Sequence, residues 1–198
     1  MFEYITNFEK IIADFYNAPY AVATDCCTHA IELCLRLQKI KQTSVPKHTY
    51  LSIPMTLDKL NIYYEWRDDY WQNFYYFSNT NIIDAAVYWK KNGYIKDTFM
   101  CLSFQHKKHL SLGRGGCILL SNEQDYLELI KMSYDGRSRD KPWAEQNVTT
   151  IGYHYYMTPE TALLGIDKFY QITDIVPKFW SYNDYPDLSK LKVFSHVK

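Results

Sequence analysis

The chain of 198 residues is 47% apolar, and its 22 basic residues balance its 22 acidic ones. Because binding to nucleic acid of any sequence depends on neutralising phosphates, a neutral chain without a basic stripe argues against that class of protein. Neutrality also favours self-association. The length predicts one domain with a sizeable core.

The five cysteines are odd in number and contain no C-x-x-C pair. The sequence therefore predicts neither a disulfide framework nor a metal site. Acidic residues stand early in the N-terminal segment, which lacks the apolar stretch of a secretory signal, and no apolar run approaches the length of a membrane span. We expect a cytoplasmic protein with no membrane partner.

The first forty residues predict a helix, a strand and a second helix. Residues 2–16 place apolar side chains at helical spacing, and "YAVAT" at 20–24 is typical of a short buried strand. Residues 25–40 keep a helical period, and either Asp25 or Thr28 is suited to cap that helix. A strand, a polar turn and a helix start in this order favour anion binding through backbone N–H groups.

Short strands alternate with helices in the rest of the chain. Strands are predicted within 44–50, 61–66, 73–86 (two), 97–104 and 116–121. Helices are predicted at 51–60 with a break near Pro54, at 122–134 after Asn122, and at 158–172 with Thr158 as cap and Pro159 in the first position. Residues 135–150 predict a loop, and the last stretch has no strong pattern. The alternation indicates an α/β fold with a largely parallel sheet.

Seven segments, taken in order, carry a family resemblance: "TDCCTHAIEL", "VPKHTY", "NIIDAA", "LSFQHKK", "GRGGCILLS", "YDGR" and "GYHYYMTPETALLG". Together they resemble the DegT/StrS family of sugar aminotransferases, which are enzymes of the cofactor pyridoxal 5'-phosphate. The resemblance implies a three-layer sandwich around a central, mostly parallel sheet. It also implies a cofactor-binding large domain at 1–175 and a short tail at 176–198, with the family's small C-terminal domain largely missing.

The resemblance assigns the central catalytic role to Lys108. This residue stands five positions after Ser103, where the family has its Schiff-base lysine, whereas Lys107 is one position short and is expected to point outward or toward substrate phosphate. A lysine amine can bond the cofactor aldehyde and later move a proton. The alternative is an exposed lysine pair at a strand end. His106 and His109 also leave the register open, because one branch of the family has histidine instead of lysine.

The other cofactor contacts also follow from matched positions. Asp84 matches the acidic residue that keeps the pyridine nitrogen protonated, with a turn-capping aspartate as the alternative. Tyr50 matches an aromatic residue that stacks on the cofactor ring, although an ordinary tyrosine is a serious alternative in a chain with nineteen. Ser103, Cys27 and Thr28 match the phosphate cradle, with Cys27 in place of a glycine.

Two departures concern cofactor and partner contacts. Val87 stands where the family has a polar residue near the cofactor's phenolic oxygen, and His154 and Tyr156 replace an asparagine and an arginine. The resemblance implies a homodimer with shared active sites, in which His154 reaches the partner's cofactor phosphate. The alternative is a surface histidine on a monomer.

Two functions remain open. In the first, an enzyme moves an amino group from an amino-acid donor, as a rule glutamate in this family, to a keto group of a nucleotide-linked sugar. In the second, a shortened family member binds pyridoxal phosphate or a partner without efficient turnover. Val87 and the missing C-terminal domain favour the second function, whereas Asp84, Ser103 and Lys108 together favour the first.

Overall fold

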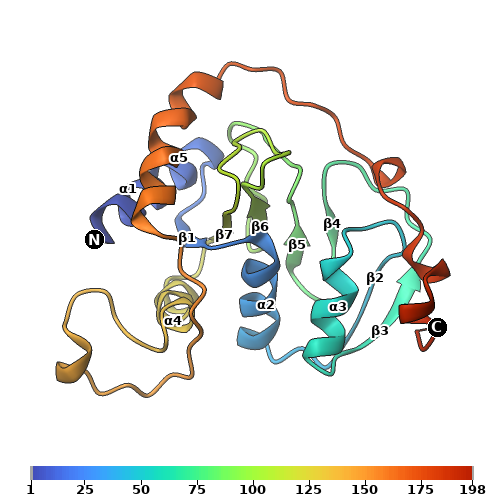
Figure 1. Ribbon diagram of the computed structural model, residues 1–198, viewed down its shortest axis with the longest axis horizontal. Coiled ribbons are helices and arrows are strands. Elements are labelled where there is room, and N and C mark those ends of the chain that lie inside the picture. The colour runs from blue at the N-terminus through green and yellow to red at the C-terminus, as the bar shows by residue number, and fades with distance from the viewer. Residues whose placement is uncertain (1, 198) are drawn as a thin grey trace.

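Residues 2–197 of the computed structural model form five α-helices and seven strands (Figure 1). The helices are α1 (Phe2–Tyr16), α2 (Cys27–Leu37), α3 (Ser52–Lys59), α4 (Glu123–Ser133) and α5 (Pro159–Ile172). The strands are β1 (Tyr20–Thr24), β2 (Gln42–Pro46), β3 (Tyr63–Arg67), β4 (Tyr75–Tyr76), β5 (Ile82–Asp84), β6 (Phe99–Ser103) and β7 (Gly116–Leu120). Short 3-10 turns stand at Trp143–Glu145, Tyr182–Asp184, Leu188–Lys190 and Lys192–Phe194.

The central sheet has the strand order β1-β7-β6-β5-β4, and β2 and β3 form a separate parallel pair. The predicted α/β class with a central sheet is confirmed, but within this sheet only β5 and β6 pair in parallel. The expectation of mostly parallel pairing therefore needs correction. Residues 104–115, which join β6 to β7, contain no helix that could carry the chain across the sheet, so the chain returns antiparallel.

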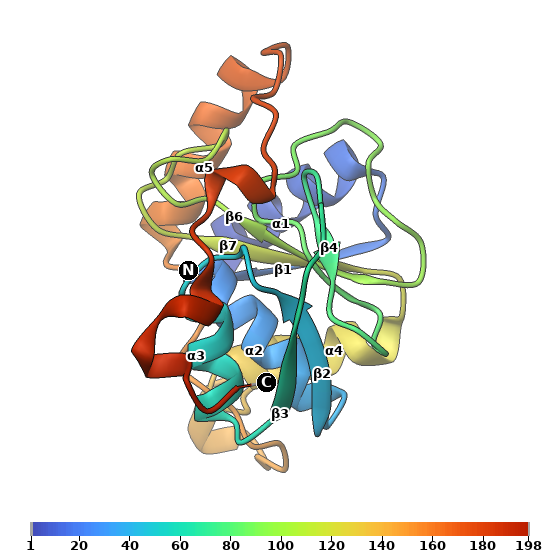
Figure 2. The same ribbon diagram turned by 90° about the vertical axis from the view of Figure 1, so that its right-hand side faces the viewer.

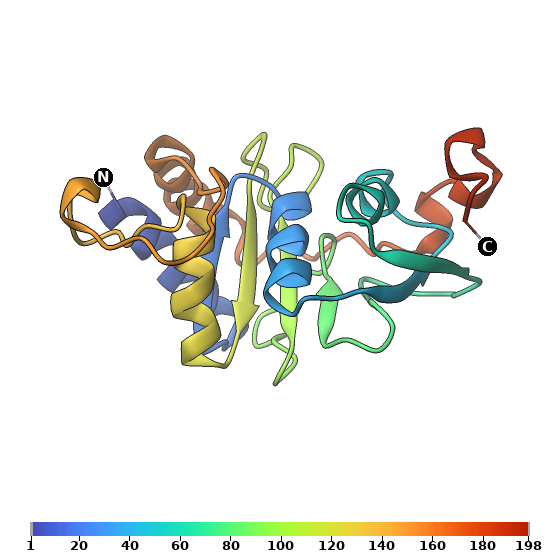
Figure 3. The ribbon, with the colours of Figure 1, turned by 90° about the horizontal axis from the view of Figure 1, so that it is seen from below.

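Alternation along the strands separates two apolar layers. Val22, Cys101 and Ile118 belong to the cluster that packs under α2 and α4, whereas Ala23 and Leu119 belong to the cluster under α1 and α5. Side chains of a strand point to opposite faces in turn, so the sheet is covered on both sides. Figure 3 shows α2 in blue and α4 in yellow on the same side of the strands. The result is the expected sandwich of three layers.

The start of α2 differs from the prediction. Its N-cap is Cys26, which makes no side-chain cap hydrogen bond, and neither Asp25 nor Thr28 caps the helix. Asp25 is engaged elsewhere, because its carboxylate accepts hydrogen bonds from His29 and Arg114. The first N–H groups of a helix have no intrahelical acceptor, so this helix start is left open toward a ligand.

Proline and cap positions explain three other helix starts. Pro54 lies in the first turn of α3, where its missing N–H breaks no helical hydrogen bond, so the predicted interruption is wrong. The Asn122 side chain accepts from the N–H of Asp125, and Thr158 accepts from the N–H of Thr161. Both predicted caps are confirmed.

The chain after α5 runs across the molecule to the β2–β3 pair (Figures 1 and 2). Its anchor is Phe194, which is fully buried and meets the Trp66 ring edge-on at 5.8 Å between centroids. The N–H of Leu188 donates to the carbonyl of Lys47 at 2.9 Å. These contacts hold the segment against the β2–β3 pair. Among residues 2–197, no helix has both the length and the apolar character needed to cross a membrane.

Candidate active site

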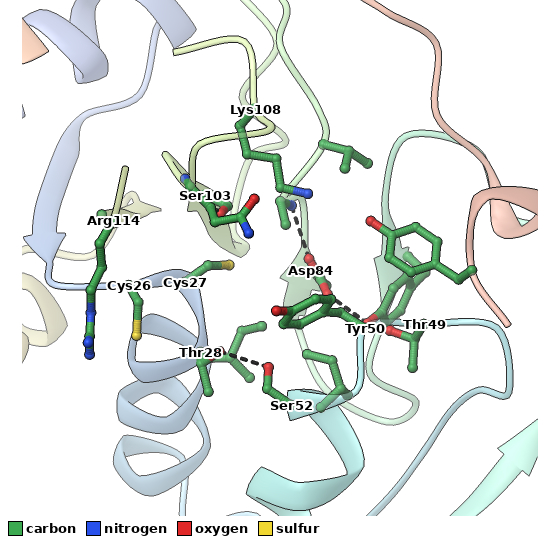
Figure 4. A pocket seen from close by; sticks show the side chains of 18 of the residues that line it. Cys26, Cys27, Thr28, Thr49, Tyr50, Ser52, Asp84, Ser103, Lys108 and Arg114 are labelled. Carbon is green, nitrogen blue, oxygen red and sulfur yellow. Dashed lines mark hydrogen bonds between the residues drawn. The ribbon is translucent and has the colours of Figure 1, made fainter. Parts of the chain in front are cut away.

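A pocket opens where β5 and β6 end and α2 begins (Figure 4). Its cavity volume is about 150 Å³, which is enough for a small organic group because a cavity of about 10–15 Å³ already holds one water molecule. Parallel strands present their carboxyl ends at one edge, where α/β folds commonly bind ligands. Six residues singled out from the sequence line this pocket: Cys27, Thr28, Tyr50, Asp84, Ser103 and Lys108.

Lys108 and Asp84 face the same space from different elements. The Lys108 side chain extends from the loop after β6 toward Asp84, the last residue of β5 (Figure 4). Burial lowers the pKa of Lys108, although Asp84 and Cys27 oppose the shift. Burial likewise raises the pKa of Asp84, against hydrogen bonds from Tyr75 and the N–H of Ala86. Each group is therefore held nearer its neutral form than in water.

A hydrogen-bonded chain fixes the Asp84 carboxylate. The Tyr75 hydroxyl donates to Asp84 Oδ2 at 2.7 Å, and the N–H of Ala86 donates to Oδ1 at 3.0 Å. Tyr75 is in turn 2.5 Å from the Thr49 hydroxyl. Asp84 is 7% exposed, so these bonds supply what water would otherwise provide. The carboxylate is oriented before any ligand arrives.

The open start of α2 forms one end of the pocket. Cys27 and Thr28 line it, and the Thr28 hydroxyl lies 2.8 Å from that of Ser52 (Figure 4). A Cβ at Gly116 would come within 2.4 Å of the backbone of Cys26, so only glycine lets β7 approach this turn. The result is a cradle of hydroxyls and helix N–H groups suited to an anion.

A cationic cluster adjoins this cradle. Asp25 accepts from His29 Nδ1 at 2.6 Å and from Arg114 at 2.7 Å, and the His29 ring stacks on Tyr155 at 3.6 Å between centroids. Burial by itself lowers the pKa of His29, but the hydrogen bonds to Asp25 and Cys26 outweigh it and raise the pKa to about 9. One carboxylate thus faces two cations, which adds positive charge where an anion would bind.

The remaining sequence-predicted residues divide between pocket and surface. Tyr50 lines the pocket with 54% of its surface exposed, and Val87 lines it from a buried position. Lys107 is exposed and is not among the lining residues. The His154 side chain is 70% exposed and bonds Asp135 at 3.0 Å, outside the pocket. In the described chain it therefore lies apart from the other six candidates, all of which line the pocket.

Sequence reasoning missed several lining residues. Arg114 stood in the quoted "GRGG" segment, and its place before two glycines was the available signal. Tyr75 was hidden among nineteen tyrosines, and Tyr185 lies in the segment without a pattern. Nothing local in the sequence distinguishes these two tyrosines.

The chemistry of the donor set fits pyridoxal phosphate. The open α2 start, with the hydroxyls of Thr28, Ser52 and Ser103, suits a phosphate group. Lys108 offers a half-buried amine to an aldehyde, and the buried carboxylate of Asp84 suits a protonated ring nitrogen. The three requirements of one ligand are thus met around a single cavity.

The pocket thus brings together an amine, a carboxylate and an anion cradle, which are the groups expected of a pyridoxal-phosphate site. Comparison with protein families then narrows the class. The model of the DegT/DnrJ/EryC1/StrS aminotransferase family matches residues 1–61 and 83–178, and the chain belongs to this family. A search of curated proteins gives no match.

Solved structures share the fold. AtS13 from Actinomadura melliaura has a TM-score of 0.75 and 17% identity, over 85% of this chain and 60% of that one. The sugar aminotransferase CalS13 from Micromonospora echinospora has a TM-score of 0.71 and 12% identity, over 86% and 61%. Spr1654 from Streptococcus pneumoniae, in its PLP form, has a TM-score of 0.69 and 17% identity, over 85% and 59%. The chain thus spans about 60% of the length of these structures.

Proposed function

We propose that the protein is a pyridoxal-phosphate-dependent aminotransferase acting on a sugar. The observation that carries the proposal is the entry of Lys108 and Asp84 into one pocket beside the open start of α2. Family membership and the PLP form of a structural relative support it. When bound, the cofactor supplies a ring that withdraws electrons from the substrate carbon.

The chain's own groups divide the work. The hydroxyls of Thr28 and Ser103 and the N–H groups at the start of α2 hold the phosphate end. The Asp84 carboxylate, oriented by Tyr75, holds a proton at the ring nitrogen. The Lys108 amine moves a proton to and from the substrate carbon, and its lowered pKa enlarges the neutral fraction that can do so.

For substrates, we propose an amino-acid donor, with L-glutamate as the first choice, and a keto group on a nucleotide-linked sugar as acceptor. The support is family membership and the name of the relative CalS13, a sugar aminotransferase. The two substrates would use the pocket in turn, in a ping-pong exchange. The rim toward Arg114 is cationic and suits an acceptor that carries phosphate.

The test begins with visible absorbance of the purified protein, with and without added pyridoxal phosphate. A new band that borohydride reduction fixes to Lys108 supports cofactor binding, and its absence contradicts the proposal. Formation of 2-oxoglutarate from glutamate, in the presence of a keto sugar nucleotide, then tests turnover. A protein that binds cofactor without turnover is the second candidate function, and the apolar Val87 in the pocket favours it.

We also propose a two-fold homodimer in which His154 reaches the partner's phosphate site. Its 70% exposed side chain, away from its own pocket, supports that proposal. Mass in solution and the cofactor affinity of His154→Ala test it. A monomer that binds cofactor tightly would contradict an active site shared between two subunits.

A cytoplasmic location is also proposed, because all five cysteines are unpaired and four of them are buried.

A further inference from the structure

The segment after α5 brings two side chains to Lys108. The Trp180 ring centroid lies 5.0 Å from Lys108 Nζ, and the same ring lies 3.7 Å from Lys178 Nζ. Two ammonium groups therefore share one indole. Trp180 stands beyond residue 178, where the family match ends, so the match does not cover this contact.

The backbone around Trp180 is fixed against the opposite side of the pocket. The backbone N–H of Asn73 donates to the Trp180 carbonyl at 2.8 Å, and the backbone N–H of Trp180 lies 3.5 Å from Asn73 Oδ1. The next residue, Ser181, forms an antiparallel bridge with Gln72. The indole is thus attached to a segment that is itself anchored, and it forms a fixed platform.

We propose that Trp180 is a positioning residue that holds the Lys108 amine at the pocket. A lysine stem has four rotatable carbons, and an ammonium within about 6 Å of an indole centroid is attracted to its face. At 5.0 Å the Lys108 amine lies within that range. The inference rests on the proposed role of Lys108, because positioning matters only for an amine that reacts.

Lys178 lowers the pKa of Lys108, whereas the Trp180 ring is expected to raise it. Its charge disfavours a proton on Lys108, whereas the indole face favours one. The other groups that act on Lys108 are Asp84 from β5, Cys27 from α2, and Lys107 and His109 from its own loop. Since Lys178 is 61% exposed and Trp180 is half-buried, the two contributions can be removed separately.

The experiment measures the free amine in cofactor-free protein. Lys108 is labelled with trace acetic anhydride across a pH series and quantified by peptide mass spectrometry. Trp180→Leu removes the ring, so the Lys108 labelling profile is expected to move to lower pH by about half a unit. Lys178→Gln removes the competing charge, so the profile is expected to move to higher pH.

Matched controls separate this effect from a general change in the protein. Trp143→Leu, at a 69% exposed tryptophan, and Lys91→Gln, at an exposed lysine, are expected to leave the profile unchanged. Trp180→Phe keeps a weaker ring and is expected to give a smaller downward shift than Trp180→Leu. Should Trp180→Leu fail to fold, Trp180→Phe decides the matter.

The outcomes are distinct from those of the proposed function. A downward shift in the Trp180 variants supports positioning, and an unchanged or upward profile overturns it. These readings need no cofactor, so a protein that fails to bind pyridoxal phosphate but shows the shift refutes only the proposed function. A protein that binds the cofactor but shows no shift refutes only the role of Trp180.

Discussion

The two walls of the pocket are built in different ways. We call the residues from the start of α2, the ends of β5 and β6 and the following loop the helix wall, and it lies within the family match. We call Trp71, Tyr75 and Tyr185 the aromatic wall, and these side chains come from the 62–82 gap in that match or from beyond its end. The helix wall holds the charged and hydroxyl groups, whereas the aromatic wall supplies apolar surface and the hydroxyl that orients Asp84.

The comparison indicates that the proposed chemistry restricts the residues of the helix wall more than those of the aromatic wall. For the proposed function, the helix wall must present an amine, a carboxylate and N–H groups in fixed positions, and this wall has the lysine, the aspartate and the serine expected from the family resemblance. The aromatic wall needs shape and a few hydrogen bonds, which many sequences can provide. A change in the first wall should therefore affect the chemistry, and a change in the second should affect stability and fit.

The largest effect is expected at Lys108. Lys108→Ala should abolish the visible absorbance of lysine-bound pyridoxal phosphate, because no other amine lines the described pocket. The measurement is an absorbance titration with the cofactor. Lys107→Ala is the matched control and should keep the band, since Lys107 is exposed. Loss of the band in the control instead would place the reactive amine one position earlier.

The segment after α5, which carries Tyr185 of the aromatic wall, should show its largest effect in stability. Phe194→Ala should lower the free energy of unfolding by about 3 kcal/mol, because a fully buried ring leaves a cavity beside Trp66. Denaturant unfolding measures this, and limited proteolysis reports release of the segment. Val193→Ala, at a 56% exposed neighbour, should change little. Equal losses in both variants would show that the Phe194 anchor is not what holds the segment.

At Asp84 the effect should be large on turnover and small on binding. Asp84→Asn should keep the cofactor and reduce amino transfer about a hundredfold, since an amide does not hold the ring nitrogen protonated. Single-turnover reaction with glutamate measures the loss. The exposed Asp174→Asn serves as the control. Full activity in Asp84→Asn would remove this carboxylate from the mechanism.

The smallest effect concerns pH and the cationic cluster. The pKa of His29 is raised from 6.5 to about 9 in the folded protein, so its contribution to stability is complete below pH 6.5 and lost as the pH rises through 9. The melting temperature of the native protein should exceed that of His29→Gln by about 2 to 4 °C at pH 6, and the difference should vanish above pH 9. A constant difference across this range would contradict the assigned charge.

Local signals in the sequence predicted several elements of the fold and most of the candidate site. The apolar run at 20–24 became β1 with the same bounds, and the caps at Asn122 and Thr158 formed as expected. Six of the seven candidate residues line one pocket, because the family pattern encodes spacing that the fold then brings together. Their chemical roles remain predictions.

Features that depend on distant contacts escaped prediction. The antiparallel return of β7 depends on a connection without a helix, and one oxygen of Asp25 is engaged by Arg114, which is far along the chain. Phe194 lies in a 3-10 turn without periodicity, and its burial depends on Trp66. No window of sequence contains both partners of such contacts.

The order of these walls along the chain has a consequence for protein synthesis. A ribosome releases β1 long before β7, which supplies its only sheet partner among the described strands, so the early nascent chain exposes an unpaired apolar strand. Tyr185 emerges later still, after all the elements of the helix wall. The pocket is therefore complete only after the segment that follows α5 has been translated.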